Sequence, residues 1–302
     1  MRGVLKWVGI ILGGLVALLL VAFGVVYLQS ETIQNKTYEL PAVSITVPTD
    51  AAALERGKHL VTVVSDCTGC HGPDLSGGAV VDDPAIGRLI APNLTNGAGG
   101  FGTLLSDDDI ARVLRYGLLP DGKSVRVMPA NDYTHFTDAD LGAVIAYLRS
   151  VPAVDTDHAP TALGPLGRVL LVTGQLPIMI VPRIDFANAG SPPVAMGPTR
   201  DYGAYLIDVA GCTGCHGLGL SGGPIIGAPP DFAPAANLTP SGPVGAWSEA
   251  DFINTIRTGV NPAAYQLLPD MPWMTYRNMT DDELKALWAY IQTVPAREAG
   301  TH

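Results

Sequence analysis

The chain contains two copies of the pentapeptide C-T-G-C-H, and these hold all four of its cysteines. One copy runs from Cys67 to His71 and the other from Cys212 to His216. Two thiols spaced in this way on one turn can each add to a vinyl group of one porphyrin, and the histidine that follows then lies under the iron. The motif predicts two covalently bound haem c groups, attached through Cys67, Cys70, Cys212 and Cys215, with His71 and His216 as proximal iron ligands.

Three other kinds of site use similar cysteine pairs, and each explains less of this sequence. A thioredoxin-like dithiol belongs to an α/β domain, but the chain shows no βαβ pattern. Disulfides give no reason for a histidine directly after both pairs. One zinc ion shared by the four cysteines would leave the duplication of the motif unexplained.

A low-spin haem iron needs a sixth ligand, and a methionine thioether is the ligand that raises the reduction potential. Met128 follows His71 by 57 residues and Met271 follows His216 by 55, and a proline comes directly after each methionine. Both are predicted to be axial ligands. Met274 and Met279 are alternatives in the second half, and core packing is the alternative role for any methionine.

An internal repeat of about 145 residues surrounds the two motifs. S-D-C-T-G-C-H-G-P-D-L-S-G-G at 65–78 matches A-G-C-T-G-C-H-G-L-G-L-S-G-G at 210–223, and 128–152 aligns with 271–295 without a gap. This alignment places Met271 opposite Met128. The repeat predicts two tandem domains, at 46–152 and 199–298.

Apolar spacing predicts that both domains are all-α. A helix precedes each cysteine motif, and another ends each domain, with its apolar residues on one face: Leu141, Val144, Ile145, Leu148 in the first domain and Leu284, Leu287, Trp288, Ile291 in the second. The ending helices begin with T-D-A-D at Thr137 and T-D-D-E at Thr280, which are capping sequences. Each is followed by Val-Pro, which ends a helix.

The N-terminus contains an apolar segment that is long enough to span a bilayer. Trp7 to Leu28 is 22 residues without a charge, and Arg2 and Lys6 precede it. A cleaved signal peptide has a shorter apolar core and a small-residue cleavage site. We therefore expect residues 1–30 to form an uncleaved anchor that contacts lipid through residues 7–28, with its basic end in the cytoplasm and the rest outside.

A linker at 153–198, rich in proline and glycine, joins the two predicted domains. It includes the apolar run L-G-R-V-L-L-V-T-G-Q-L-P-I-M-I-V-P at 166–182. A second membrane span is one interpretation. Arg168, Gln175 and Pro177 interrupt the run, and it is short of the ~20 residues that a span needs. Packing against the two domains is the preferred interpretation.

Each half resembles a class I cytochrome c domain, with C-x-x-C-H, an asparagine loop (A-P-N-L-T at 91–95, A-A-N-L-T at 235–239), M-P and a C-terminal helix. The pair is similar to the cytochrome subunits of membrane-bound bacterial alcohol and sugar-acid dehydrogenases, which usually carry a third haem domain. The resemblance implies that the Pro92 carbonyl accepts the Nδ1 proton of the haem histidine, and Ala236 replaces this proline in the second domain. Two roles are expected for four residues of these loops, namely contact with the haem propionates or a plain turn: Asn93, Thr95, Asn237 and Thr239.

These features predict an electron-transfer protein rather than an enzyme, held at the inner membrane with its haem domains in the periplasm. The expected partner is a membrane redox complex: a quinol oxidoreductase, a dehydrogenase or a terminal oxidase. A net charge of −10 argues against nucleic acid. Two alternatives stay open: a catalytic dihaem cytochrome of the peroxidase or thiosulfate-oxidising type, and a fixed haem subunit within a dehydrogenase complex.

Overall fold

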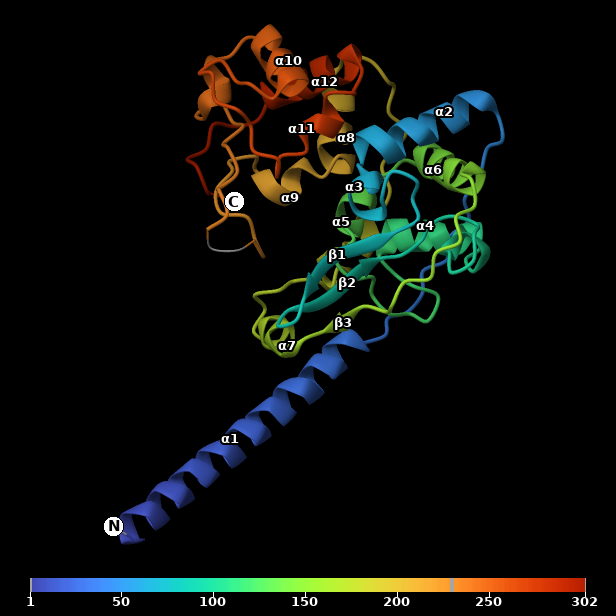
Figure 1. The fold of residues 1–302 in the computed structure, drawn as a ribbon. Coiled ribbons are helices and arrows are strands. Elements are labelled where there is room, and N and C mark those ends of the chain that lie inside the picture. The colour runs from blue at the N-terminus through green and yellow to red at the C-terminus, as the bar shows by residue number, and fades with distance from the viewer. Residues whose placement is uncertain (1, 229–230, 302) are drawn as a thin grey trace.

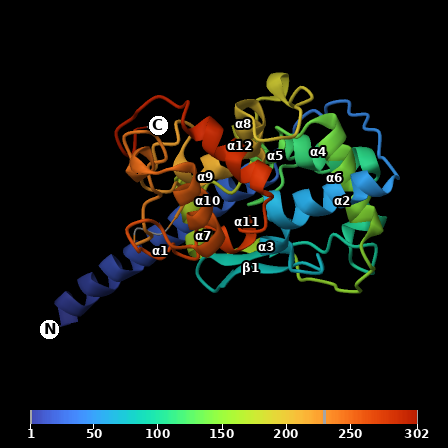
Figure 2. The same cartoon turned by 90° about the horizontal axis from the view of Figure 1, so that it is seen from above.

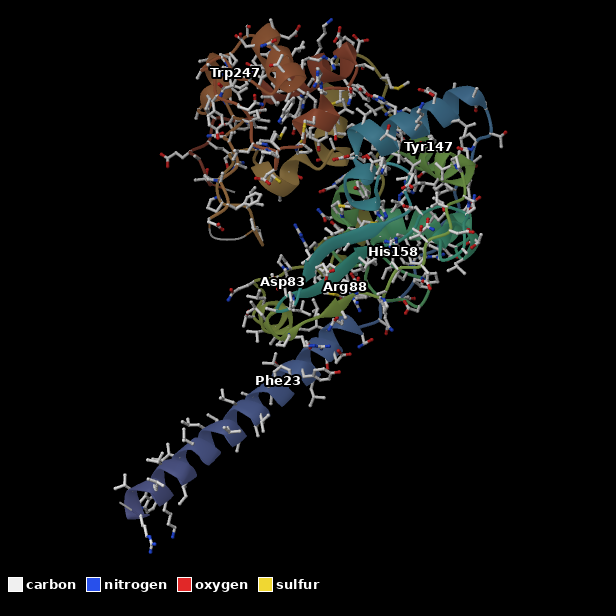
Figure 3. The ribbon with its side chains drawn as sticks, viewed as in Figure 1. Phe23, Asp83, Arg88, Tyr147, His158 and Trp247 are labelled. Carbon is white, nitrogen blue, oxygen red and sulfur yellow. The ribbon has the colours of Figure 1, made fainter. Side chains whose placement is uncertain are left out.

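A computed structural model describes residues 2–228 and 231–301 as a mainly helical protein from which one long helix projects (Figure 1). That helix is α1 (Arg2–Gln34), which is the one helix in the described residues that is long and apolar enough to cross a membrane. Its apolar side chains are exposed along most of its length, and Figure 3 labels one of them, Phe23, on the part of α1 that projects from the globular domains.

The first domain contains most of the remaining helices of the N-terminal half and two strands. Its elements in chain order are α2 (Ala51–His59), the π-helix η1 (Leu60–Val64), α3 (Cys67–His71), β1 (Gly78–Asp83), β2 (Gly87–Ala91), the 3₁₀ turn η2 (Phe101–Thr103), α4 (Asp107–Tyr116), α5 (Ala130–Tyr133) and α6 (Asp138–Ser150). The linker adds β3 (Ala162–Leu163), α7 (Pro165–Val172) and the 3₁₀ turns η3 (Val181–Arg183) and η4 (Phe186–Asn188).

The second domain repeats this order of helices. It contains α8 (Arg200–Val209), α9 (Cys212–His216), the 3₁₀ turn η5 (Pro243–Ala246), α10 (Glu249–Thr258), α11 (Trp273–Tyr276) and α12 (Asp281–Ile291). The helices predicted before each cysteine motif and at the end of each domain are therefore present. Thr137 and Thr280 cap α6 and α12 as expected.

The first and last helices of each domain cross in close contact, and a glycine makes this possible. A Cβ on Gly57 of α2 would lie 1.9 Å from the Ala143 carbonyl oxygen of α6, and one on Gly203 of α8 would lie 1.9 Å from that of Ala286 in α12. Tyr147 lies beside the first of these crossings (Figure 3). The second crossing has the same geometry, so the repeat extends to the backbone packing.

A small antiparallel sheet in the order β1-β2-β3 is an addition to the all-α prediction. Asp83 Oδ1 accepts hydrogen bonds from the amides of Ala85 and Ile86 and so closes the turn between β1 and β2. The two half-buried positions of β1 are separated by two exposed residues, so this strand lacks the alternation that identifies a strand in a sequence. The mainly helical class is confirmed, and the sheet is a local insertion in the first domain.

The apolar run of the linker packs against the first domain, whereas the preferred interpretation expected packing against both domains. Leu171, Ile178 and Met179 are buried together with Leu89 of β2 and Leu163 of β3. Ile180 packs with Val125 and Ala130 of the first domain. The apolar run is thus a covering layer, and its helical part, α7, is only eight residues long.

The two domains lie side by side and share one hydrophobic core, which includes buried residues of α6 and α12 alike (Figure 2). A buried hydrogen bond also joins the two domains: Ser65 Oγ donates to the Val209 carbonyl at 2.8 Å. Below the first domain, Arg168 of α7 ties α1 to the linker. Its guanidinium donates to Ser30 Oγ at 2.6 Å and to Glu31 at 2.7 Å, and it lies 4.2 Å from the Tyr27 ring centroid.

Candidate haem site

The two C-T-G-C-H motifs form short helices, α3 and α9, that place a histidine at the same point in each domain. His71 Nδ1 lies 2.8 Å from the Pro92 carbonyl oxygen, and His216 Nδ1 lies 2.7 Å from that of Ala236. Since Nδ1 is engaged by a carbonyl acceptor, Nε2 is left as the ligand atom. Burial lowers the pKa of both imidazoles, which favours the neutral form that binds a metal.

The second domain has Ala236 where the first has Pro92, yet the contact is the same, because asparagine side chains fix both loops. Asn93 Nδ2 donates to the Val154 carbonyl at 2.7 Å, and Asn237 Nδ2 donates to the Arg297 carbonyl at 2.8 Å. In both loops the asparagine Oδ1 also accepts the amide of the threonine two residues later. The buried asparagines and threonines thus hold the carbonyl in place by bonding to the chain that follows the last helix of the domain.

The cysteines are single thiols in environments that do not suit redox catalysis. Cys67 and Cys212 are packed against the hydrophobic core, and Cys70 and Cys215 are exposed. Burial raises the pKa of Cys67 and of Cys212 to about 12. A redox-active dithiol needs a lowered thiol pKa, so the structure disfavours the thioredoxin-like interpretation.

The structure distinguishes among the methionines of the second domain by their surroundings. Met279 is 2% exposed and takes the core position that Phe136, also 2% exposed, has in the first domain. Met274 is 56% exposed. Met271 and Met128 each precede a short helix, α11 and α5, and both are half-buried against the core. Their equivalent places keep Met128 and Met271 as the predicted ligands.

One cavity of about 1200 Å³ connects the two motifs. Its lining is mainly apolar and includes every predicted site residue: Cys67, Cys70, His71, Met128, Cys212, Cys215, His216 and Met271. A pocket for one small molecule usually has about 300–1,000 Å³, so this volume suits more than one group. A neutral imidazole, a thioether and two thiols in each domain, around a mainly apolar space, are the donor set that haem c needs. The residues present therefore fit haem c in both domains.

A polar cluster between the domains was not anticipated from the sequence. Arg56 of α2 binds Asp140 of α6 at 2.7 Å and reaches Glu283 of α12 at 3.5 Å. His59 Nε2 lies 2.8 Å from the other oxygen of Glu283. Tyr202 and Tyr205 of α8 donate to Glu283 and Asp140 at 3.2 and 2.6 Å. The two carboxylates occupy equivalent places in the repeat, three residues after the capping threonine, but their binding partners lie in both domains.

Comparison with known proteins agrees with these features. The family model described as cytochrome c matches residues 54–152 and again residues 201–295, which together are more than half of the chain. The chain belongs to the cytochrome c family, and C-x-x-C-H in that family attaches haem c. The two matched regions each contain one cysteine motif and one Met-Pro pair.

Several relatives align with both domains. The cytochrome c subunit of alcohol dehydrogenase (quinone) of Gluconobacter oxydans is 28% identical over 83% of this chain and 56% of its own length. The cytochrome c subunit of gluconate 2-dehydrogenase of Pantoea cypripedii is 28% identical over 82% of this chain and 61% of its own. A dihaem cytochrome c of Cereibacter sphaeroides is 26% identical over 77% and 83%. The chain thus spans under two thirds of the two dehydrogenase subunits.

Proposed function

We propose that this chain is a membrane-tethered dihaem cytochrome that relays electrons between membrane redox partners. The observation that carries the proposal is the single cavity lined by two complete and equivalent sets of His, Met and Cys residues. When bound, haem c supplies one-electron chemistry through ferric and ferrous iron. The chain attaches each porphyrin by two thioethers, orients each imidazole through a carbonyl and surrounds both groups with apolar side chains.

Each iron is proposed to be six-coordinate, with His71 and Met128 in the first domain and His216 and Met271 in the second. Filled axial positions leave no site for a substrate, which suits electron transfer rather than peroxide or thiosulfate chemistry. Because one cavity contains both motifs, the haems would lie near each other, and an electron could enter at one domain and leave from the other.

The proposed location is the outer face of the inner membrane. α1 crosses the bilayer through residues 7–28, and Arg2 and Lys6 remain in the cytoplasm under the positive-inside rule. The bonds of Arg168 to Ser30 and Glu31 fix the globular part at the end of this helix. Tethering raises the effective concentration of partners in the same membrane.

The proposed partner is a membrane redox complex. It is a quinol-oxidising complex, a dehydrogenase or a terminal oxidase. The names of the Gluconobacter and Pantoea relatives favour a second possibility, namely that the chain is the fixed haem subunit of a dehydrogenase. Co-purification separates the two. A fixed subunit stays with a catalytic subunit through solubilisation in mild detergent, and a tethered carrier is recovered without one but is reduced by its donor complex.

A redox titration of the detergent-solubilised holoprotein tests the proposal, followed by visible and electron paramagnetic resonance spectra. Two low-spin haems with methionine ligation are expected, at a haem-to-protein ratio of about two, as two attachment motifs require. Carbon monoxide should leave the spectrum of the reduced protein unchanged. A high-spin haem, or one that binds carbon monoxide, would instead indicate a catalytic dihaem cytochrome.

A further inference from the structure

The first domain places a buried carboxylate against the haem-attachment helix of the second domain. Asp132 belongs to α5, four residues after Met128. Its Oδ2 is so near Gly211, the residue before Cys212, that a Cβ on Gly211 would lie 2.9 Å from it. Asp132 is 6% exposed, and the Asn131 amide donates to its Oδ1 at 2.8 Å. The carboxylate is therefore held between α5 and α9.

The first attachment helix has a carboxylate in the equivalent place, but from its own domain. Asp66 precedes Cys67 as Gly211 precedes Cys212, and its Oδ2 would lie 2.8 Å from a Cβ on Gly69 of α3. The repeat partner of Asp132 is Thr275 of α11, which faces Asp66 across the interface and opposes the rise that burial causes in the pKa of Asp66. A carboxylate thus lies against a glycine at each haem-attachment helix, and the first domain supplies it in both cases: Asp66 for its own helix and Asp132 for that of the second domain.

The electrostatic influence of each carboxylate reaches one attachment site. Burial is the main cause that raises the pKa of all four thiols, and a nearby acid adds to it. At Cys67 and Cys70 that acid is Asp66. At Cys212 and Cys215 the acid with the largest effect is Asp132, to which Asp208 adds at Cys212 and Asp270 at Cys215. The two sites are therefore separable by mutation.

We propose that Asp132 lowers the reduction potential of the haem in the second domain by holding a negative charge beside Cys212 across the domain interface. Ferric haem carries one more positive charge than ferrous haem, so a nearby carboxylate stabilises the oxidised form. Partial burial weakens solvent screening and strengthens the effect. The inference rests on the proposed dihaem function. It makes the potential of one haem depend on the packing of the other domain.

The charged groups that face Asp132 determine the conditions of the test. Arg183 of η3 stabilises its charge, and Asp208 of α8, which lies 3.9 Å from His135 Nδ1, opposes it. Burial is the main cause that raises the pKa of Asp132 to about 7. Titrations at about pH 9, well above that pKa, keep the carboxylate charged.

The experiment is a redox titration of holoprotein carrying Asp132→Asn, with Asp66→Asn as the matched variant. Asp132→Asn is expected to raise the reduced-to-oxidised ratio of the second haem about tenfold at fixed potential, which is about 59 mV for a one-electron couple, and to move the first haem less. Asp66→Asn is expected to raise this ratio for the first haem and to move the second haem less. Repeating both in a Met271→His background assigns the haems, because imidazole in place of thioether lowers the potential of the second haem alone.

The controls separate this inference from the proposed function. Asp132→Glu keeps the charge and should leave the potential near its original value. Arg183→Gln, at an exposed residue, should move the second haem to lower potential and serves as the test if Asp132→Asn loses haem. Two methionine-ligated haems that do not respond to Asp132→Asn, or that respond equally, would overturn the inference and leave the proposed function standing. A parent protein without two such haems would overturn the function itself.

Discussion

The two Met-Pro loops differ in how they are held, although the sequences around them are repeats. In the first domain the linker clamps the loop from outside: the Val127 amide donates to the Ile178 carbonyl at 2.9 Å, and Ser124 Oγ accepts the amides of Ile180 and Val181 at 3.1 Å. Ile180 itself is 2% exposed. The loop that precedes Met128 is therefore part of a buried layer.

The loop before Met271 is held from within its own domain and is more open to solvent. The Leu267 amide donates to the Gly259 carbonyl at 2.7 Å, and the Met271 amide donates to the Leu268 carbonyl at 3.1 Å. Tyr265 and Leu268 are exposed at 54% and 40%. Loops with fewer buried contacts open at lower free-energy cost, so the second methionine is the more easily displaced of the two.

The histidine side shows no such difference. Both imidazoles meet a carbonyl at nearly equal distance, and both carbonyl loops are fixed by an asparagine. The repeat therefore determines the histidine side of each iron, whereas sequence outside the repeat, mainly the linker, determines how firmly the methionine is held.

The largest effect is expected from removing one methionine at a time. Met128→Ala and Met271→Ala should each abolish the thioether-to-iron absorption near the red edge of the oxidised spectrum for one haem. Each should lower the potential of that haem by a few tenths of a volt, since axial ligands span about 0.8 V. Optical redox titration measures both changes. If either variant removed the whole band, or none of it, the assignment of one methionine to each domain would be wrong.

A smaller effect is expected from removing the cation that joins carboxylates of the two domains. Arg56→Ala leaves the buried carboxylate of Glu283 and the half-buried one of Asp140 without their shared cation, and removing one partner of a buried ion pair costs about 3–5 kcal/mol. The midpoint of guanidinium unfolding measures this loss. Arg88→Ala is the control, because its pair with Asp82 is exposed and such pairs contribute less than about 1 kcal/mol. Equal losses in the two variants would show that the cluster does not hold the domains together.

The sequence was sufficient for features that recur in both halves. The gapless alignment of 128–152 with 271–295 placed Met128 and Met271 in equivalent positions, and the capping threonines identified the start of α6 and α12. These features are local or repeated, so one copy supports the other. The apolar N-terminal helix was equally clear from its long segment without a charge.

The features that were missed depend on contacts between distant segments. Arg56 and Glu283 are 227 residues apart, and nothing near either one indicates the other. Asp132 and Gly211 meet only because the two domains pack in one particular way. The π-helix at 60–64 did leave a signal: Gly57 lies ten residues before Cys67, and Gly203 lies nine before Cys212. One extra residue in an otherwise equal helix is accommodated as a π-bulge.

The smallest effect should appear when an external ligand competes for the irons. Added imidazole is expected to displace Met271 at about tenfold lower concentration than Met128, a difference of about 1.4 kcal/mol in loop opening, because the linker bonds hold only the first loop. Loss of the thioether band against imidazole concentration should therefore have two phases, and the phase at low concentration should be absent in Met271→Ala. Ile180→Ala, which weakens the clamp, should bring the phases together. Displacement of Met128 first would mean that the linker does not control access to the iron.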